Sequence, residues 1–276
     1  MVVVHLTNGF GNNLFQYIAA RLLASFHNKE LIVVPPSEDY YGINELKSVG
    51  VDFSKKHKKG NFININEQNY KLAFSAEYSN FDFVLFGYFE DYTFFHEKID
   101  LIKSWFPKIQ KRKDNDLVIH FRAGDRLFYK NEFDYKPKVE NYINAIKKFD
   151  FSDLHIVTDM LQWEHLTREK LANMKFHVNV PTSNRVDPQL SIDYFNSFVD
   201  GLAEYNPVIE KRTISEDFNF IRSFDNILFQ HGTLGWWAAC LSNASKVGVY
   251  GPWRPWKGKT NKNLSNIPLK GWFKWQ

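Results

Sequence analysis

The sequence predicts an α/β fold in two domains, and three observations carry that prediction. Short apolar runs rich in β-branched residues alternate with helix-like segments, and strands that alternate with helices form parallel sheets flanked by helices. The alternation is interrupted by a proline and a charge cluster over Phe106–Asp116, and then resumes. A chain of 276 residues is long for one domain and sufficient for two. We therefore expect Rossmann-like domains over 1–112 and 113–276.

The expected elements follow this alternation along the chain. Each strand is a short apolar run bounded by polar or turn-forming residues. In the first domain the expected strands are Val2–Leu6, Glu30–Pro36 and Asp82–Phe89, with a helix over IAARLLASF. In the second domain they are Leu117–Arg122, Leu154–Asp159, Asp225–Gln230 and Lys246–Gly251, with helices over VENYINAIKKF, EHLTREKLANM and LGWWAACLS.

Composition restricts the class of protein. Hydrophobic residues make up 44% and charged residues 24% of the chain, as in globular proteins, and no apolar stretch approaches the roughly 20 residues that cross a bilayer. No signal sequence is recognisable, and the single cysteine, Cys240, cannot form an internal disulfide. We expect a cytoplasmic protein, soluble or peripheral to a membrane. Its net charge of +4 suits an anionic ligand or a membrane surface but is too small for a nucleic-acid-binding protein.

The stretch GFGNNLFQY lies where the first strand leads into a helix. Gly9 and Gly11 fit the first two glycines of the dinucleotide-binding fingerprint, but Leu14 stands where the third is needed, which argues against a nicotinamide cofactor. The amides of Gly11, Asn12 and Asn13, at a helix N-terminus, can instead face an anion or a sugar. The alternative is a tight turn in which the asparagines cap the helix.

The stretch VIHFRAGDR ends the first strand of the second domain. The period of two along a strand puts His120 and Arg122 on one face, and ligands of open α/β sheets lie outside the carboxyl ends of the strands. Arg122 offers a planar fork suited to phosphate. Gly124 permits a turn from which Asp125 can fold back to brace either side chain. The alternative is a buried ion pair beside a core histidine.

The stretch FQHGTLGWWAACLS combines a strand end with a helix start. We expect Thr233 to cap the helix, so that its hydroxyl and the neighbouring amides form a second phosphate site. Trp236 and Trp237 are expected to pack in the core, because their helix must cover its sheet.

Together these stretches resemble the alpha-1,2-fucosyltransferases of glycosyltransferase family 11. GFGNNLFQY resembles their Gly-x-Gly-Asn-Gln-x-Phe-Gln-Tyr opening, HFRAGDR their His-x-Arg-x-Gly-Asp-Tyr motif, and HGTLGWWAACL their Ser-Ser-Phe-Ser-Trp-Trp segment. FGYFEDYTFF and IVTDM resemble two further segments in the same order, so the resemblance covers most of the chain.

The resemblance implies a GT-B-like architecture, two Rossmann-like domains with parallel sheets facing a central cleft, with the acceptor on the side of the first domain. It implies that the enzyme inverts the anomeric carbon without a metal or another cofactor. The transferred sugar would be L-fucose, taken from GDP-fucose and moved to a glycan hydroxyl. A lipid-linked glycan is one candidate acceptor. The implied donor-site residues are Arg122 at the diphosphate, His120 and Asp159 near guanine, and Thr233 at phosphate, with His231 and Gly232 beside it. The residues implied to line the cleft are Gly9, Gly11, Asn12 and Asn13. The C-terminal tail is a candidate for packing across the cleft.

This chain departs from the family pattern around the donor. Asn13 replaces a glutamine, Ala123 an arginine, Arg126 a tyrosine, and His231 to Thr233 an Asn-Ser-Ser cluster. A transferase of the same fold with another UDP- or GDP-linked hexose or pentose therefore stays an alternative. A second alternative is a non-catalytic glycan-binding protein, because the tryptophans of YGPWRPWKGK and GWFKWQ could stack on sugars.

The chemistry of glycosyl transfer sets its own requirements. Arg122, Thr233 and helix-start amides can stabilise the charge that grows on a leaving diphosphate. The acceptor hydroxyl needs a proton acceptor, and the candidate carboxylates are Glu90, Asp91, Asp125, Glu132 and Asp134. Asp114–Asp116 matches a minimal metal-binding Asp-x-Asp pattern but precedes its strand, so we expect a solvated turn there and no metal.

Overall fold

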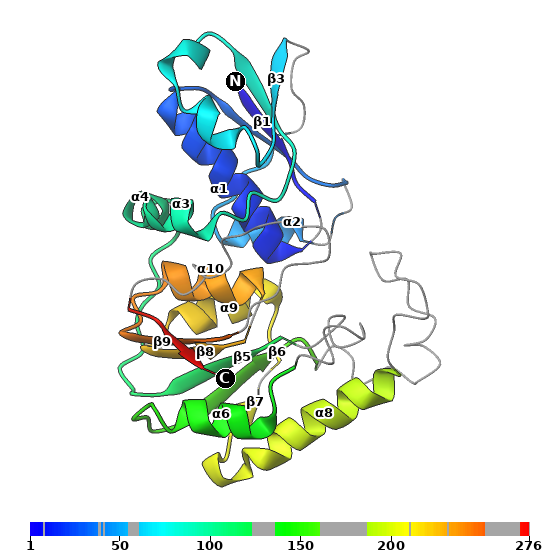
Figure 1. Ribbon diagram of the computed structural model, residues 1–276, viewed down its shortest axis with the longest axis vertical. Coiled ribbons are helices and arrows are strands. Elements are labelled where there is room, and N and C mark those ends of the chain that lie inside the picture. Colours follow the sequence, from blue (N-terminus) through cyan, green and yellow to red (C-terminus); the bar gives the residue numbers. More distant parts are fainter. Residues whose placement is uncertain are drawn as a thin grey trace. The chain divides into compact units, whose positions relative to one another are not determined.

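The computed structural model consists of two compact α/β units (Figure 1). It describes residues 1–7, 9–37, 40, 42–54, 61–122, 136–160, 187–209, 211–230, 232–251 and 271–275. Unit 1 comprises Met1–Lys108 and Thr213–Phe218, and unit 2 comprises Ile109–Arg212 and Asn219–Gln276. The division after Lys108 lies close to the expected boundary at 112, whereas no sequence pattern indicated that Thr213–Phe218 would group with the first unit.

Unit 1 contains a parallel sheet with the strand order β2-β1-β4-β3. Its strands are β1 (Val2–His5), β2 (Leu31–Val34), β3 (Phe62–Ile65) and β4 (Asp82–Leu85). The helices are α1 (Phe10–Phe26), α2 (Ile43–Ser48), α3 (Tyr92–His96) and α4 (Ile99–Lys103), with short 3-10 turns at Tyr70–Ala73 and Ala76–Tyr78. The valines of β1 are fully buried, as expected of a central parallel strand with both faces covered.

Unit 2 contains a larger parallel sheet with the strand order β10-β9-β8-β5-β6-β7. Its strands are β5 (Leu117–Phe121), β6 (Leu154–Thr158), β7 (Val208–Ile209), β8 (Asn226–Phe229), β9 (Lys246–Tyr250) and β10 (Phe273–Trp275). Its helices are α6 (Val139–Ile146), α8 (Pro188–Gly201), α9 (Ile214–Arg222, shared with unit 1) and α10 (Thr233–Leu241), with a 3-10 turn at Ala203–Tyr205. The predicted α/β fold class with parallel sheets is thereby confirmed.

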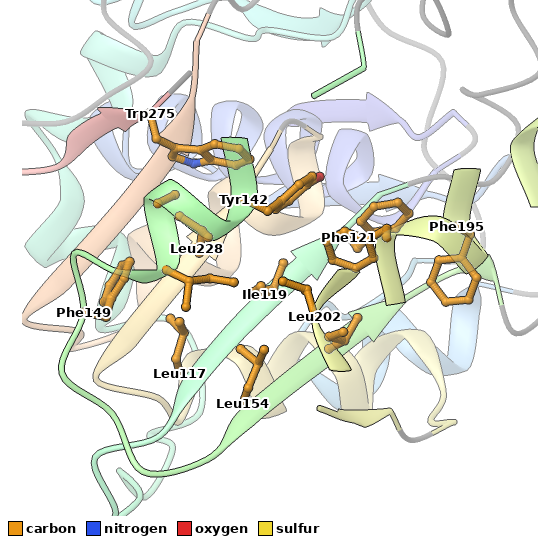
Figure 2. Packing of buried hydrophobic residues seen from close by; sticks show 14 of the residues in the cluster. Leu117, Ile119, Phe121, Tyr142, Phe149, Leu154, Phe195, Leu202, Leu228 and Trp275 are labelled. Atoms are coloured by element: carbon orange, nitrogen blue, oxygen red, sulfur yellow. The ribbon is translucent and has the colours of Figure 1, made fainter. Parts of the chain in front are cut away.

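The two faces of strand β5 have different surroundings. Leu117, Ile119 and Phe121 are fully buried in the core shared with α6 and α8 (Figure 2). The ring of Phe121 stacks on that of Phe198, with centroids 4.2 Å apart. His120 points to the opposite face, which α10 covers. The packed core on the face of Leu117, Ile119 and Phe121 therefore holds the end of β5 in place. His120 extends from the other face of the same strand.

In unit 1 the two central strands are β1 and β4, and β4 is the last strand of that sheet along the chain. In unit 2 the chain leaves β5 for β6 on one side and leaves β8 for β9 on the other, so the connections at the carboxyl ends of these two adjacent strands diverge. Such a switch point is where open α/β sheets bind ligands.

Two expectations about local structure are wrong. Strand β4 ends at Leu85 instead of Phe89, because Gly87 (φ 143°) and Phe89 (φ 55°) leave the extended region. Asp116 is not in a solvated turn: its carboxylate is buried at the amino end of β5, where it accepts from Arg112 over 2.6 Å and from the amide of Asp153 over 3.2 Å.

Several described elements, which include β3, α8 and β7, were not predicted from the sequence. The helix expected over EHLTREKLANM lies outside the described residues, as do residues 252–270 of the tryptophan-rich tail. Phe273–Trp275 of that tail pairs with β9. Within the described ranges, we find no helix whose length and hydropathy would allow it to cross a membrane.

Candidate functional site

Three polar side chains follow directly after the central strands of unit 2. Arg122 follows β5, Asp159 follows β6 and Gln230 follows β8, so all three lie at the carboxyl edge of the sheet. The guanidinium of Arg122 forms an ion pair with the carboxylate of Asp159. Arg122 is 30% and Asp159 19% exposed, so a ligand can reach the pair from solvent.

Gln230 ties the end of β8 to the end of β5. Its side chain is fully buried, and its Nε2 donates to the carbonyl oxygen of Arg122 over 2.5 Å. Its Oε1 accepts from the hydroxyl of Tyr142 on α6. The carboxamide therefore fixes the backbone on which the arginine stands, and it does so at the switch point between β5 and β8.

Helix α10 begins beside Arg122. Gly232 is the N-cap, with φ 113°, and a Cβ atom there would lie 3.5 Å from Cγ of Arg122. The expectation that Thr233 caps the helix is wrong, because Thr233 is already the first helical residue and no side chain caps the helix. The first-turn amides of a helix lack partners within the helix, so this helix start next to the arginine suits an anion.

His120 lies on the same side of the sheet as this helix start. A Cβ atom on Gly235 would come within 2.4 Å of its Nδ1, so only glycine fits at that position of α10. Burial, together with the charge of Arg122, lowers the pKa of His120 to about 3, and the ring is neutral at physiological pH. In the part of the chain that the structure describes, its buried Nδ1 has no hydrogen-bond partner.

The predicted donor residues are thus partly assembled. His120, Arg122, Asp159, Gly232 and Thr233 lie around the carboxyl ends of β5, β6 and β8, where Trp236 and Trp237 are fully buried core residues. Asp125 and His231, and the carboxylates Glu132 and Asp134, lie outside the described residues. Among the residues that are described, no three His, Cys, Asp or Glu side chains group as a metal site would require.

In unit 1 the glycine-rich stretch forms the turn between β1 and α1. Gly9 is the N-cap, with φ 93°, and no side chain caps the helix, so the asparagines do not act as its cap. Gly11 and Asn13 are buried, whereas Asn12 is partly exposed. The Nδ2 of Asn13 donates to the hydroxyl of Tyr40 over 3.0 Å.

Gln16 joins two strand ends in unit 1, as Gln230 does in unit 2. Its buried Oε1 accepts from the backbone amide of Thr7 over 3.0 Å, and its Nε2 donates to the carbonyl of Gly87 over 2.8 Å. The carboxamide therefore joins the segment after β1 to the segment after β4, the two central strands of this sheet.

Two of the candidate proton acceptors lie in the segment after β4. Asp91 is the N-cap of α3, where it accepts from the amide of Phe94 over 3.1 Å, and it also pairs with Lys71 over 2.7 Å. Glu90 is partly buried. Asp91 thus serves both the helix and the lysine, and both carboxylates stay candidates for the base.

Sequence reasoning missed Gln16, Gln230, Tyr142 and Gly235. A polar residue at the end of the apolar run DNILFQ was a signal for Gln230, and the glutamine of GFGNNLFQY was part of a quoted motif, but neither pattern reveals a partner. Nothing in the sequence indicated that Gly235 must leave room for His120.

The class of site is thus a parallel α/β unit with an arginine–aspartate pair at its switch point beside a helix start, an arrangement suited to an anion. No protein-family model matches the chain, and no curated protein matches it in sequence. A solved structure of Arabidopsis thaliana FUT1, a mutant in complex with GDP, is similar with a TM-score of 0.46 and 10% identity, over 93% of this chain and 70% of that chain. A likeness of this extent says nothing about the ligand of the present site.

Proposed function

We propose that the protein is a nucleotide-sugar glycosyltransferase, inverting and independent of a metal ion, with GDP-fucose as the favoured donor and a glycan hydroxyl as the acceptor. One observation carries the proposal. Arg122 lies at the switch point of a six-stranded parallel sheet, with its aliphatic stem against the N-cap of α10. A diphosphate matches both the planar cation and the helix start.

The proposed transfer is a single displacement. The acceptor oxygen attacks the anomeric carbon while the bond from that carbon to the diphosphate oxygen breaks, and the proton of the acceptor hydroxyl passes to a carboxylate. Negative charge grows on the leaving diphosphate, and Arg122, the first-turn amides of α10 and the hydroxyl of Thr233 are the groups that would stabilise it. Glu90 and Asp125 are the candidate proton acceptors.

The ion pair gives Asp159 a second possible role. A carboxylate at a strand end can accept from the paired donor edge of guanine, which uracil lacks. In this structure the carboxylate instead holds the guanidinium of Arg122. The two roles make different predictions, because a residue that orients Arg122 contributes to binding of every nucleoside diphosphate, whereas a residue that reads guanine contributes to GDP alone.

Thermal unfolding of the full chain with GDP, UDP or CMP tests the proposal. A ligand at about a hundred times its Kd adds roughly 2.7 kcal/mol, which raises the Tm of a chain of this size by a few degrees. We expect the largest shift with GDP and the loss of most of it in Arg122→Ala. A matched control is Asp225→Ala, since Asp225 pairs with Lys111 near the amino end of β8 and away from the switch point.

Asp159→Ala separates the two roles. Loss of the GDP shift with an unchanged UDP shift assigns the carboxylate to guanine, whereas equal losses assign it to Arg122. A shift with UDP and none with GDP overturns the choice of donor but keeps a glycosyltransferase. No shift with any nucleotide overturns the glycosyltransferase and favours a glycan-binding protein.

Transfer activity is expected to persist in excess EDTA, because the arginine and the helix start take the part that a metal plays at other diphosphates. Turnover that collapses on chelation and returns with Mn²⁺ or Mg²⁺ would contradict the metal-independent mechanism while leaving the diphosphate site in place.

A further inference from the structure

Two aromatic side chains of unit 1 are exposed directly after strand β4. Phe86 is 52% and Tyr88 37% exposed. The register pairs Val4 of β1 with Leu85 of β4, so His5 and Phe86, the next residues, lie side by side at the carboxyl ends of these strands. Their rings are nearly parallel, 4° apart, with centroids at 6.3 Å. We call His5, Phe86 and Tyr88 the aromatic platform.

The backbone beneath the platform is held in an unusual conformation. Phe89 has φ 55°, which is rare for a bulky residue, and its side chain is buried. Oε1 of Glu67 accepts from the amide of Tyr88 over 2.7 Å and contacts that of Phe89 at 3.4 Å. At Gly87 a Cβ atom would come within 2.5 Å of the same carboxylate. Strained backbone that its surroundings enforce is typical of ligand sites.

The position of the platform also points to a ligand. It stands at the carboxyl ends of the two central strands β1 and β4, and Gln16 joins the segments after these strands by bonding Thr7 and Gly87. Phe89 is buried while its neighbours Phe86 and Tyr88 are exposed, so this segment presents aromatic surface to solvent. Apolar patches on a protein surface can mark ligand-binding sites.

The chemistry of the platform selects the kind of ligand. Flat ring faces favour a partner that is apolar on one face, and the phenol, imidazole and carboxylate of Tyr88, His5 and Glu90 favour a partner with polar groups at its edge. A pyranose ring combines the two, because C–H groups cover one face and hydroxyl groups surround it. A larger protein partner would call for a broader apolar area than two exposed rings.

We propose that the aromatic platform binds a pyranose ring of the glycan acceptor, with Phe86 as its main contact. This inference rests on the proposed function, since it assigns the substrate class that the transferase would glycosylate. Glu90 and Asp91, the two described candidate bases, follow Phe86 by four and five residues and are then close in sequence to the acceptor site.

The test compares two phenylalanines of the same strand region. Phe86 follows β4, and Phe81, 46% exposed, precedes it. Phe86→Ala, Phe81→Ala and Phe86→Trp are assayed with GDP-fucose as donor and lactose or N-acetyllactosamine as acceptor. We expect Phe86→Ala to raise KM for the acceptor about threefold to tenfold, because one aromatic contact contributes binding free energy of that size. KM for the donor should stay unchanged. Phe81→Ala should change neither, and Phe86→Trp should restore acceptor KM.

Saturation-transfer NMR with methyl β-galactoside and lactose gives a readout that needs no turnover. The unaltered protein should transfer saturation to the ring C–H protons of the sugar, and Phe86→Ala should abolish this while retaining its GDP thermal shift. Equal acceptor KM and equal saturation transfer in Phe86→Ala and Phe81→Ala overturn the platform and leave the proposed function intact. Sugar binding that depends on Phe86 in a protein with no nucleotide shift supports the platform and overturns the proposed function instead.

Discussion

The two units join the segments that follow two central parallel strands with the same device, and they carry different side chains beside it. In unit 1 the buried carboxamide of Gln16 donates to the carbonyl of Gly87, and in unit 2 that of Gln230 donates to the carbonyl of Arg122. In both, a neutral side chain joins the segments that follow two adjacent parallel strands. The shared device explains rigidity at the carboxyl edge and not the choice of ligand.

What differs is the set of groups placed on that edge. Unit 2 carries a cation, a carboxylate and a buried neutral histidine, whereas unit 1 carries exposed aromatic rings and a partly exposed asparagine. Under the two proposals, the strand ends of unit 2 bind an anion and those of unit 1 bind a sugar ring. The difference between the strand ends is therefore what the predictions test, unit by unit.

The largest effect is expected from the cation of unit 2. Arg122→Ala should reduce the turnover of transfer roughly a hundredfold or more, on the order of 3 kcal/mol, because a charge-assisted contact to the leaving diphosphate is lost. Arg122→Lys should restore little, since a point charge cannot replace the planar fork. Steady-state kinetics measure both, with circular dichroism to verify folding. Near-normal turnover in a folded Ala variant would remove Arg122 from the mechanism.

The glutamines permit a matched comparison of the two edges. Gln230→Leu and Gln16→Leu each leave a partly buried carbonyl without its donor, so each should lower the free energy of unfolding by about 1–3 kcal/mol in urea titrations. Gln230→Leu should also weaken the GDP thermal shift, whereas Gln16→Leu should leave it unchanged and raise KM for the acceptor. If both variants affected GDP equally, the division of tasks between the edges would be wrong.

The last prediction concerns acid. Because the pKa of His120 in the folded chain is about 3, below its ordinary value of 6.5, the folded state binds fewer protons than the unfolded state between these values. The free energy of unfolding should therefore fall as pH decreases from 6.5 toward 3, by at most about 1.4 kcal/mol per pH unit from this residue. Urea titrations from pH 7 to 4 should show a shallower slope for His120→Asn. Identical slopes would mean that the ring is solvated.

Much of the fold was predictable because its signals are local. The strands β5, β6, β8 and β9 appear as short apolar runs, and the period of two along a strand was enough to place His120 and Arg122 on one face. What could not be predicted depends on contacts distant in sequence: Tyr142 meets Gln230 across 88 residues. Asp116 was misjudged for the same reason, because its burial depends on contacts with Arg112 and Asp153 that its sequence pattern does not reveal.

The close approach of Gly235 to His120 has a consequence for recognising homologous sequences. With 2.4 Å between an added Cβ and Nδ1, a methyl group at 235 and an imidazole at 120 exclude one another. Homologous sequences with histidine at 120 should therefore keep glycine at 235, and those with alanine or serine at 235 should carry a smaller residue at 120. A pair that changes together in this way would identify distant relatives even where the glycine-rich opening and the arginine motif have diverged.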